Sequence, residues 1–236
     1  MCGRYTQTRP ASELASDLDV LLDDALRSHA ALRPRYNIAP TQDVPIVLER
    51  KTRALRVVRW GLLPSFTRSA KDAPLMINAR AESLADKPAF REPLRTQRCL
   101  VLADGFYEWK RHEAAPLAAA GAKVTKTPYY LRPACDAPFA FAGLWEMWRT
   151  PEGDVIPSCT IITVPPSCFV SSIHDRMPAI LRGADFDAWL RYETRDPEKL
   201  LPLLRPAPED ALTSHRVSSR VGNARQDDVE LIAPVS

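Results

Sequence analysis

The chain has 236 residues, of which 45% are hydrophobic and 26% charged, and its formal net charge is +3. This length supplies a buried core for one large domain or two small ones, while so small a net charge does not by itself indicate nucleic-acid binding. Because there is no apolar run of about 18 residues and no basic-then-apolar start, we expect neither a membrane-spanning helix nor a secretory signal, and no membrane partner.

The first half of the chain predicts one helix followed by strands. Leucines at helical spacing, with acidic residues between them, predict a helix over residues 10–28. Pro34 and Pro40 then favour an irregular extended segment in "RPRYNIAPTQ". The runs "VPIVLE" and "LRVVRWGLL" are rich in β-branched residues and predict strands, and a short helix is expected near residues 82–90.

The second half predicts more strands and ends in short helices. "RCLVLADGFYEW" indicates a strand, a turn at Asp-Gly and a second strand, and "HEAAPLAAAGAKVTKT" an exposed loop. "TPYYLR", "PFAFAGLWEMW", "CTIITV" and "SHRVS" indicate further strands. "ADFDAWLRY" and "DPEKLLPLL" predict helices, with Asp185 and Asp196 as N-caps.

These elements do not alternate as regular βαβ units. We therefore predict an α+β fold: a single domain, residues 1–236, around a mostly antiparallel, barrel-like β-sheet with short flanking helices. The five cysteines are odd in number and form no Cys-x-x-Cys pair, which predicts reduced thiols in a cytoplasmic protein. No metal-ligand spacing or Gly-rich phosphate loop is present, so no metal ion or nucleotide cofactor is expected.

The stretch "MCGRY" places a cysteine directly after the initiator methionine. Removal of Met1 would leave Cys2 with an α-amine and a thiol on adjacent carbons, a pair that an internal cysteine lacks. Arg4 supplies a nearby cation, which favours the thiolate. The alternative is that Cys2 belongs to an untied terminus and has no role.

Three further stretches contain candidate functional residues. In "MINARAES", Asn78 and Arg80 would face the same side of a strand. Glu108 in "DGFYEWK" lies either on a solvated face or buried beside aromatic residues, where its pKa would rise and suit acid–base work. His174 in "SSIHDRMPAIL" is either a proton shuttle or a structural histidine.

Taken together, these stretches resemble the SOS-response-associated peptidase family. The resemblance extends over nearly the whole chain, in matching order, through "MCGRY", "RYNIAPTQ", "RWGLLPS", "INARAES", "CLVLADGFYEWK", "PFAFAGLWE", "TIITV", "IHDRMPAIL" and "VSSRVGNARQDDVELIAPV". It implies a protein that recognises abasic sites in single-stranded DNA and forms a covalent DNA–protein crosslink through Cys2. It also implies a peptidase label, from autoproteolytic removal of Met1 in some members.

The chemistry of an abasic site suits an N-terminal cysteine. The ring-opened abasic sugar is an aldehyde, which an α-amine can convert to a Schiff base. The neighbouring thiol can then close on the imine carbon to give a five-membered thiazolidine. By resemblance, Asn78 orients Cys2 or the sugar, Glu108 transfers protons during imine formation, and His174 protonates the sugar oxygen.

The resemblance also implies a DNA-binding set that acts on phosphates and bases around the lesion. Its members are Arg4, Asn37, Pro40, Phe66, Arg80, Thr163 and Arg176. Phe66 stands where the family commonly has Trp, which predicts weaker base stacking. Ser172 is a second departure, in "VPPSCFVSSIHD". The expected protein is a cytoplasmic monomer that associates with the nucleoid when bound to damaged DNA.

Two other classes of function remain open at the level of the sequence. An N-terminal-nucleophile amidohydrolase or peptidase would use Cys2 to attack a carbonyl, with Glu108 and His174 assisting. A plain single-strand-binding module would leave Cys2 idle. A denaturation-resistant adduct that requires Cys2 separates both from a crosslinking protein.

Overall fold

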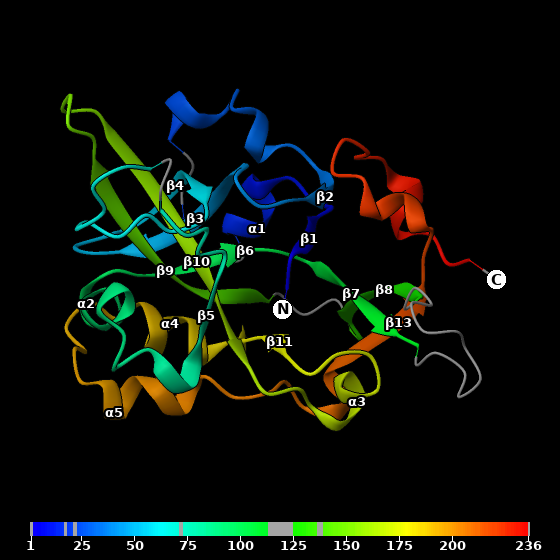
Figure 1. Cartoon of the computed structure of the whole chain (residues 1–236). Helices are drawn as coiled ribbons and strands as arrows, with labels where there is room; N and C mark the ends of the chain where they lie inside the picture. The colour runs from blue at the N-terminus through cyan, green and yellow to red at the C-terminus, as the bar shows by residue number, and fades with distance from the viewer. Residues whose placement is uncertain are drawn as a thin grey trace, which may run out of the picture.

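The computed structural model describes residues 2–16, 18–20, 23–70, 73–112, 125–135 and 139–235. A closed barrel forms the centre of the fold (Figure 1). Strand β10 pairs in parallel with β4 through Ser158 and Cys159 and antiparallel with β9, so the order β10-β4-β3-β6-β9 returns to β10. The barrel strands are β3 (Asp43–Glu49), β4 (Arg53–Trp60), β6 (Arg98–Leu102), β9 (Ala140–Arg149) and β10 (Val155–Val164).

A second, five-stranded antiparallel sheet packs against the barrel. Its order is β13-β8-β7-β1-β2. Tyr5 of β1 is fully buried and makes edge contacts with Trp60 and Phe141 of the barrel, with ring centroids 5.2 and 5.7 Å apart. The strands are β1 (Arg4–Gln7), β2 (Arg35–Ile38), β7 (Gly105–Arg111), β8 (Lys126–Pro133) and β13 (Leu212–Arg216). The N-terminal strand is thus fixed inside the sheet, between β7 and β2.

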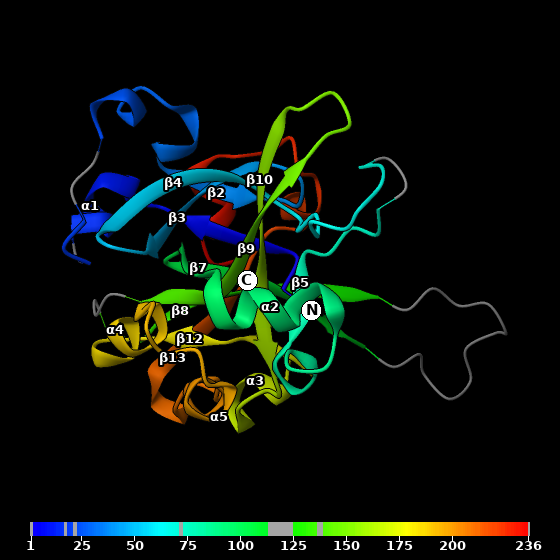
Figure 2. The ribbon, with the colours of Figure 1, turned by 90° about the vertical axis from the view of Figure 1, so that its left-hand side faces the viewer.

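Short elements surround these sheets, as the two views at right angles show (Figures 1 and 2). Three short strands extend the barrel sheet: β5 (Asn78–Arg80), β11 (Met177–Pro178) and β12 (Ile180–Leu181). The α-helices are α1 (Ala11–Ser16), α2 (Pro88–Thr96), α3 (Cys168–Ser171), α4 (Ala184–Leu190) and α5 (Pro197–Leu200). Single 3-10 turns are η1 (Asp24–Leu26), η2 (Ala30–Leu32), η3 (Ala81–Ser83), η4 (Leu201–Leu203), η5 (Glu209–Ala211), η6 (Ser219–Gly222) and η7 (Val229–Ile232).

The predicted fold class is confirmed: the chain is α+β, mostly antiparallel and built on a barrel. Two local predictions are wrong. The helix expected over residues 10–28 is only α1, after which Asp19 has φ 55° and η1 follows. Helix α4 begins after Gly183, so Asp185 lies inside it, whereas Asp196 caps α5 by accepting from the N–H of Glu198 at 3.0 Å.

The strand–turn–strand segment at residues 98–109 also differs from a simple hairpin. Strand β6 pairs with β3 and β9 in the barrel, while β7 pairs with β1 and β8 in the other sheet. The turn at Asp104 therefore carries the chain from one sheet to the other. The loop predicted over residues 112–127 falls largely outside the described residues. Among the helices that the structure describes, none has the length and apolarity to cross a membrane.

Candidate active site

Cys2, Glu108 and His174 form one cluster next to the start of β1. Strand β1 pairs with β7 so that Arg4 lies opposite Tyr107, and this register places Cys2 near the part of β7 that carries Glu108. Cys2 is fully buried and Glu108 is 2% exposed. His174 follows α3, and its Nε2 lies 3.6 Å from Oε2 of Glu108. Of the two alternatives for Glu108, the structure has the buried one.

Burial sets the charges in this cluster. Burial raises the pKa of the Cys2 thiol well above its ordinary value, and the neighbouring Glu108 carboxylate raises it further. Burial also raises the pKa of Glu108, to about 7, with a contribution from Asp175. Burial lowers the pKa of His174. These shifts favour a protonated thiol and a neutral imidazole, and they bring the pKa of the Glu108 carboxyl group close to neutral pH.

The expectation that Arg4 favours a thiolate is wrong in this structure. The Arg4 guanidinium donates to Oδ1 of Asn37 at 2.8 Å and to the carbonyls of Val221 and Gly222 at 2.6 and 3.1 Å. The guanidinium therefore forms hydrogen bonds to Asn37 and to the C-terminal part of the chain. Burial of Cys2 is the main cause of the raised pKa of its thiol.

His174 has both a donor and an acceptor at its second ring nitrogen. The N–H of Arg176 lies 3.0 Å from Nδ1, and Oδ1 of Asp175 lies 2.9 Å from the same atom. A neutral imidazole with its hydrogen on either nitrogen thus finds a partner at Nδ1. This arrangement suits the transfer of a proton toward or away from Glu108.

Asn78 presents an unused acceptor. It lies in β5, which pairs in parallel with β10 at Ile161. Its Nδ2 donates to the carbonyl of Ile77 at 3.0 Å, while its buried Oδ1 has no hydrogen-bond partner among the described residues. Buried side-chain oxygens are normally satisfied, so this atom is suited to accept from a bound ligand or an amine.

Arg80, Thr163 and Arg176 adjoin one another beside Asn78. Arg80 is opposite Thr163 in the β5–β10 pairing, and Thr163 is fully buried. The Arg176 guanidinium donates to the Thr163 carbonyl at 2.6 Å and forms a bidentate pair with Glu82 at 2.6 and 3.0 Å. Arg80 is exposed, and its side chain has no hydrogen bond to the part of the chain that the structure describes. Sequence reasoning missed Glu82, although it lies inside the quoted "INARAES" motif.

The remaining predicted DNA-binding residues differ in exposure. Asn37 is 1% exposed, and Pro40 is half-buried. Phe66 is 63% exposed, in a loop fixed on both sides. The N–H of Leu63 donates to Oγ of Ser158 at 2.9 Å, and the carbonyl of Thr67 accepts from Nε1 of Trp148 at 2.7 Å. The structure thus presents a large aromatic side chain to solvent on an anchored loop.

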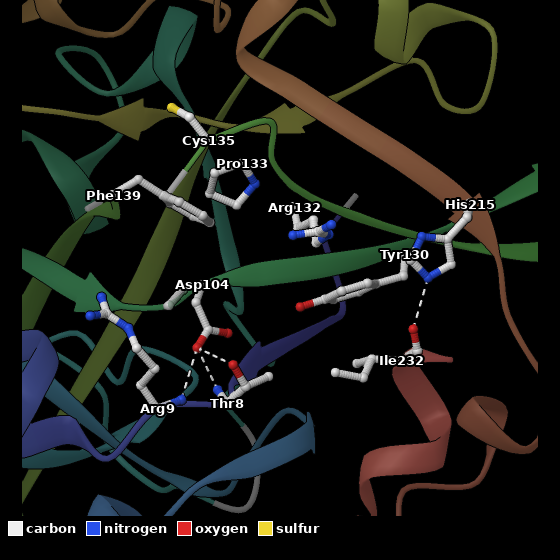
Figure 3. A pocket seen from close by; sticks show the side chains of 11 residues that line it. Thr8, Arg9, Asp104, Tyr130, Arg132, Pro133, Cys135, Phe139, His215 and Ile232 are labelled. Carbon is white, nitrogen blue, oxygen red and sulfur yellow. Dashed lines mark hydrogen bonds between the residues drawn. The ribbon is translucent and has the colours of Figure 1, made fainter. Parts of the chain in front are cut away.

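A pocket of about 600 Å³ lies elsewhere, at the far end of β1 (Figure 3). Thr8, Asp104, Tyr130 and His215 are among its lining residues, whereas Cys2, Asn78, Glu108 and His174 are not. Asp104 is already engaged there, because it accepts from Oγ1 of Thr6 at 2.7 Å and from Oγ1 of Thr8 at 2.8 Å. This pocket is therefore separate from the Cys2 cluster.

The structure gives no candidate for a metal centre in the region it describes. Within the described ranges, no group of three or more His, Cys, Asp or Glu side chains is placed to hold an ion. All five cysteines are outside disulfides, and Cys135 and Cys168 are the exposed ones.

Comparisons with known proteins match this chain over most of its length. The family model described as "SOS response associated peptidase (SRAP)" matches residues 1–224. The chain is 38% identical to the abasic site processing protein YoqW of Bacillus subtilis, over 98% of this chain and 99% of that protein. It is 34% identical to the abasic site processing protein HMCES of Pongo abelii, over 86% of this chain and 65% of that protein. The crystal structure of a Bacteroides thetaiotaomicron protein superposes with a TM-score of 0.87 at 26% identity and covers 100% of both chains.

Proposed function

Because the chain belongs to the SOS response associated peptidase family, we propose that it processes abasic sites in single-stranded DNA by forming a covalent crosslink through Cys2. The observation that carries the proposal is the cluster itself. A buried thiol at position 2 lies beside a carboxyl group with a pKa of about 7, which is 3.6 Å from an imidazole. The names of the relatives supply the substrate class.

The proposed reaction consumes one aldehyde, one amine and one thiol. After Met1 is removed, the α-amine of Cys2 adds to the aldehyde of the ring-opened abasic sugar, and loss of water gives an imine. The Cys2 sulfur then attacks the imine carbon, forming a C–S bond as the imine nitrogen becomes an amine. The thiol proton is transferred to that nitrogen, directly or through Glu108, so the net products are a thiazolidine with a ring N–H and one water molecule.

Each step needs proton transfer that the cluster can supply. The amine must lose a proton to attack, and the departing hydroxyl group must gain one. A carboxyl group with a pKa of about 7 can do both at neutral pH. We assign this role to Glu108, with His174 protonating the sugar oxygen as the ring opens. Asn78 orients the α-amine or the sugar through its unused Oδ1.

Ring closure on an imine tolerates a protonated thiol better than acyl transfer does. An amidohydrolase needs a thiolate to attack an unactivated carbonyl, and burial here raises the pKa of the thiol. An imine carbon is more electrophilic, and the thiol can pass its proton to Glu108 or to the imine nitrogen as it attacks. The runner-up function, an N-terminal-nucleophile peptidase, is therefore less well supported by this site.

We propose that the DNA strand passes over the exposed side chains of Arg80 and Phe66. Arg80 offers an exposed cation for a phosphate, and Phe66 a face for base stacking. The contact between Thr163 and Arg176 joins β10, which pairs with the Asn78 strand β5, to the chain segment that follows His174. Removal of Met1, either by the chain itself or by a methionine aminopeptidase, exposes the amine on which the reaction depends.

The test is adduct formation with single-stranded DNA that carries one abasic site. The purified protein is incubated with this DNA and analysed on a denaturing gel, with intact mass showing whether Met1 is absent. Wild type is expected to give a heat-stable adduct. Cys2→Ala, and a form with Met1 retained, are expected to give none.

Cys168→Ala is the matched control, because Cys168 is an exposed thiol outside the cluster. It is expected to crosslink at the wild-type rate. The absence of an adduct from wild-type protein that begins at Cys2 would overturn the proposal. An unchanged adduct with Cys2→Ala would equally overturn it, since another nucleophile would then be responsible.

A further inference from the structure

The C-terminal segment, residues 219–232, makes a set of polar contacts to β1 and β2 that the proposed chemistry does not use. Arg4 lies two residues after Cys2, and its guanidinium donates to two carbonyls of this segment, those of Val221 and Gly222. Asn37 accepts from the same guanidinium at 2.8 Å. The start of β1 is thus tied to the segment within a few residues of the reactive position.

Asn37 is the centre of the contact. It is 1% exposed, and its Nδ2 lies within hydrogen-bond distance of the carbonyls of Val221, Asn223 and Gln226, at 3.3, 3.0 and 2.8 Å. One buried amide therefore contacts a backbone oxygen of η6 and two more in the irregular turn that follows it. Such a fully engaged polar group fixes geometry, because losing it leaves carbonyls buried and unpaired.

Asp227 completes the contact from the side of the segment. Between Tyr5↔Ile38 and Gln7↔Arg35, strand β2 has two residues, Tyr36 and Asn37, where β1 has one, which is a β-bulge at the sheet edge. Oδ1 of Asp227 accepts from the N–H groups of both bulged residues, at 2.6 and 2.9 Å. The segment therefore stabilises the irregularity that sets the register of β1 against β2.

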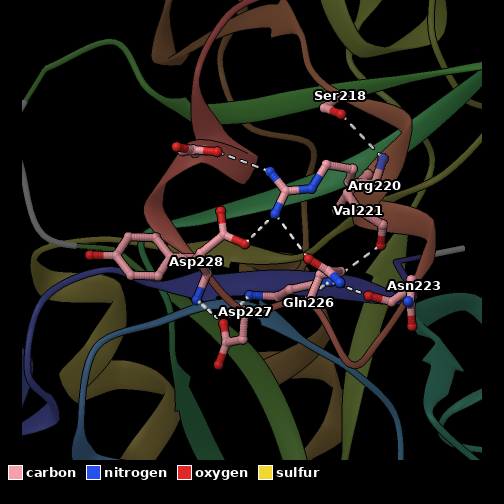
Figure 4. A network of polar contacts seen from close by, with 10 residues as sticks. Ser218, Arg220, Val221, Asn223, Gln226, Asp227 and Asp228 are labelled. Carbon is pink, nitrogen blue, oxygen red and sulfur yellow. Dashed lines mark hydrogen bonds and ion pairs between the residues drawn. The ribbon is translucent and has the colours of Figure 1, made fainter.

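The segment is itself rigidly held (Figure 4). The Arg220 guanidinium contacts Gln226, Asp228 and Glu230 at 2.9, 2.7 and 3.0 Å. Val221 and Leu231 are fully buried in a small hydrophobic cluster with Tyr107, Tyr130 and Val217. Because its two ends are anchored in this way, the segment can transmit a fixed position to Arg4 and Asn37.

We propose that residues 219–232 act as a positioning element for the reactive N-terminus: they hold Arg4 and Asn37, and through them the strand that presents Cys2. This inference rests on the function proposed above. It assigns Arg4 and Asn37 to positioning, in place of the phosphate contact that the sequence resemblance implied for them. A misplacement of about 1 Å at a reacting group can cost about a hundredfold in rate, so a loosened β1 would slow crosslinking.

The test separates reaction rate from DNA binding. Crosslinking by Asp227→Ala and Arg4→Lys is measured against DNA concentration, giving the maximal rate and the half-saturating concentration. Lysine keeps the charge of Arg4 but cannot span three acceptors with a planar fork. We expect both variants to lose about tenfold to a hundredfold in maximal rate. The half-saturating concentration should stay within about threefold of wild type, since no phosphate contact is removed.

Asp196→Ala is the matched control, because it removes a carboxylate that accepts a backbone N–H in α5, away from β1. It is expected to crosslink at the wild-type rate. Hydrogen exchange gives a readout that needs no DNA: Asp227→Ala should speed exchange in Arg4–Gln7 and leave the β9 amides unchanged. Asp227 is exposed, so this variant is expected to fold.

Two results would overturn the inference. One is a maximal rate within about twofold of wild type in both variants. The other is a raised half-saturating concentration at an unchanged rate, which would make Arg4 a phosphate ligand. If wild type itself gives no adduct, the proposed function fails. The positioning role is then tested by hydrogen exchange alone, and unchanged exchange of Arg4–Gln7 in Asp227→Ala would exclude it.

Discussion

At the scale of single residues, Glu108 is a buried carboxyl group that stabilises the fold less when it is ionised. Its pKa rises from 4.5 to about 7 because burial disfavours its charged form. Between these two values the folded state binds more protons than the unfolded state. The contribution of Glu108 to the free energy of unfolding is therefore fully present below about pH 4.5, and it is lost as the pH rises through about 7.

This pKa predicts that Glu108→Gln is more stable than wild type at pH 8. A shift of this size corresponds to a gain of up to about 3 kcal/mol, and the gain should shrink toward zero near pH 4. Urea unfolding of both proteins across this pH range measures it. Glu92→Gln, at an exposed position on α2, is the control and should show no such pH-dependent gain. A Glu108→Gln protein that is equally or less stable at pH 8 would contradict the buried, raised-pKa state.

The same substitution predicts a loss of activity. If Glu108 transfers protons, Glu108→Gln should slow crosslinking at saturating DNA by about 10²- to 10⁴-fold. The pH–rate profile should also lose its inflection near 7. The measurement is the single-turnover rate of adduct formation from pH 5.5 to 8.5. An unchanged rate and profile would remove Glu108 from the mechanism.

Sequence reasoning was effective for residues whose role depends on chemical type. Cys2, Glu108 and His174 were singled out as a nucleophile and two acid–base groups, and the structure brings them together. It was less effective for Arg4 and Glu82. The direction of a long side chain depends on partners far away in the chain, such as Val221 for Arg4 and Arg176 for Glu82. No local pattern contains that information.

At the scale of elements, the loop that carries Phe66 is anchored and presents its aromatic ring to solvent. Stacking of a base on this ring predicts that Phe66→Ala weakens binding of single-stranded DNA by about 1–3 kcal/mol, and that Phe66→Trp strengthens it. Fluorescence anisotropy with undamaged oligonucleotide measures both. Val229→Ala removes an equally exposed apolar side chain, 58% exposed in η7, and should have no effect. Equal affinities for Phe66→Ala and wild type would exclude stacking at this position.

The strands were predicted more accurately than the helices, for a physical reason. β-Branched and aromatic runs such as those of β4, β9 and β10 match a buried sheet closely. The leucine spacing over residues 10–28 is compatible with a helix, but isolated helical stretches depend on packing for their stability. Here Leu14 and Leu18 are buried in the core although α1 ends at Ser16, so the apolar spacing serves tertiary packing beyond the helix.

The sequence predicted a barrel-like sheet, but the strand order that closes the barrel and the transfer of the chain between two sheets at Asp104 could not be predicted. They depend on which strands pair, and pairing between distant strands has no local signature. β10 follows β9 directly in the chain and pairs with it, but it closes the barrel by pairing also with β4, which lies far away in sequence. The C-terminal contacts to β1 and β2 are non-local in the same way.

At the scale of the whole molecule, the net charge of +3 does not determine DNA affinity. We expect a few local arginines to contact phosphates, so the dependence of binding on salt should be shallow, with a slope of about −0.7 for each phosphate contacted. Arg80→Ala should weaken DNA binding and make the slope of log affinity against log salt concentration shallower by about 0.7, the value of one phosphate contact. Binding measured from low to moderate salt tests this. A slope that does not change on loss of Arg80 would remove it from the interface.

The most direct test of the central claim is the chemical identity of the adduct. Wild-type protein is reacted with abasic single-stranded DNA without borohydride, and the product is digested and mapped by tandem mass spectrometry. We expect a DNA fragment on Cys2 as the first residue, with the combined mass lower by one water molecule. An adduct that appears only with borohydride, or that maps to a lysine, would contradict the thiazolidine and with it the role of Cys2.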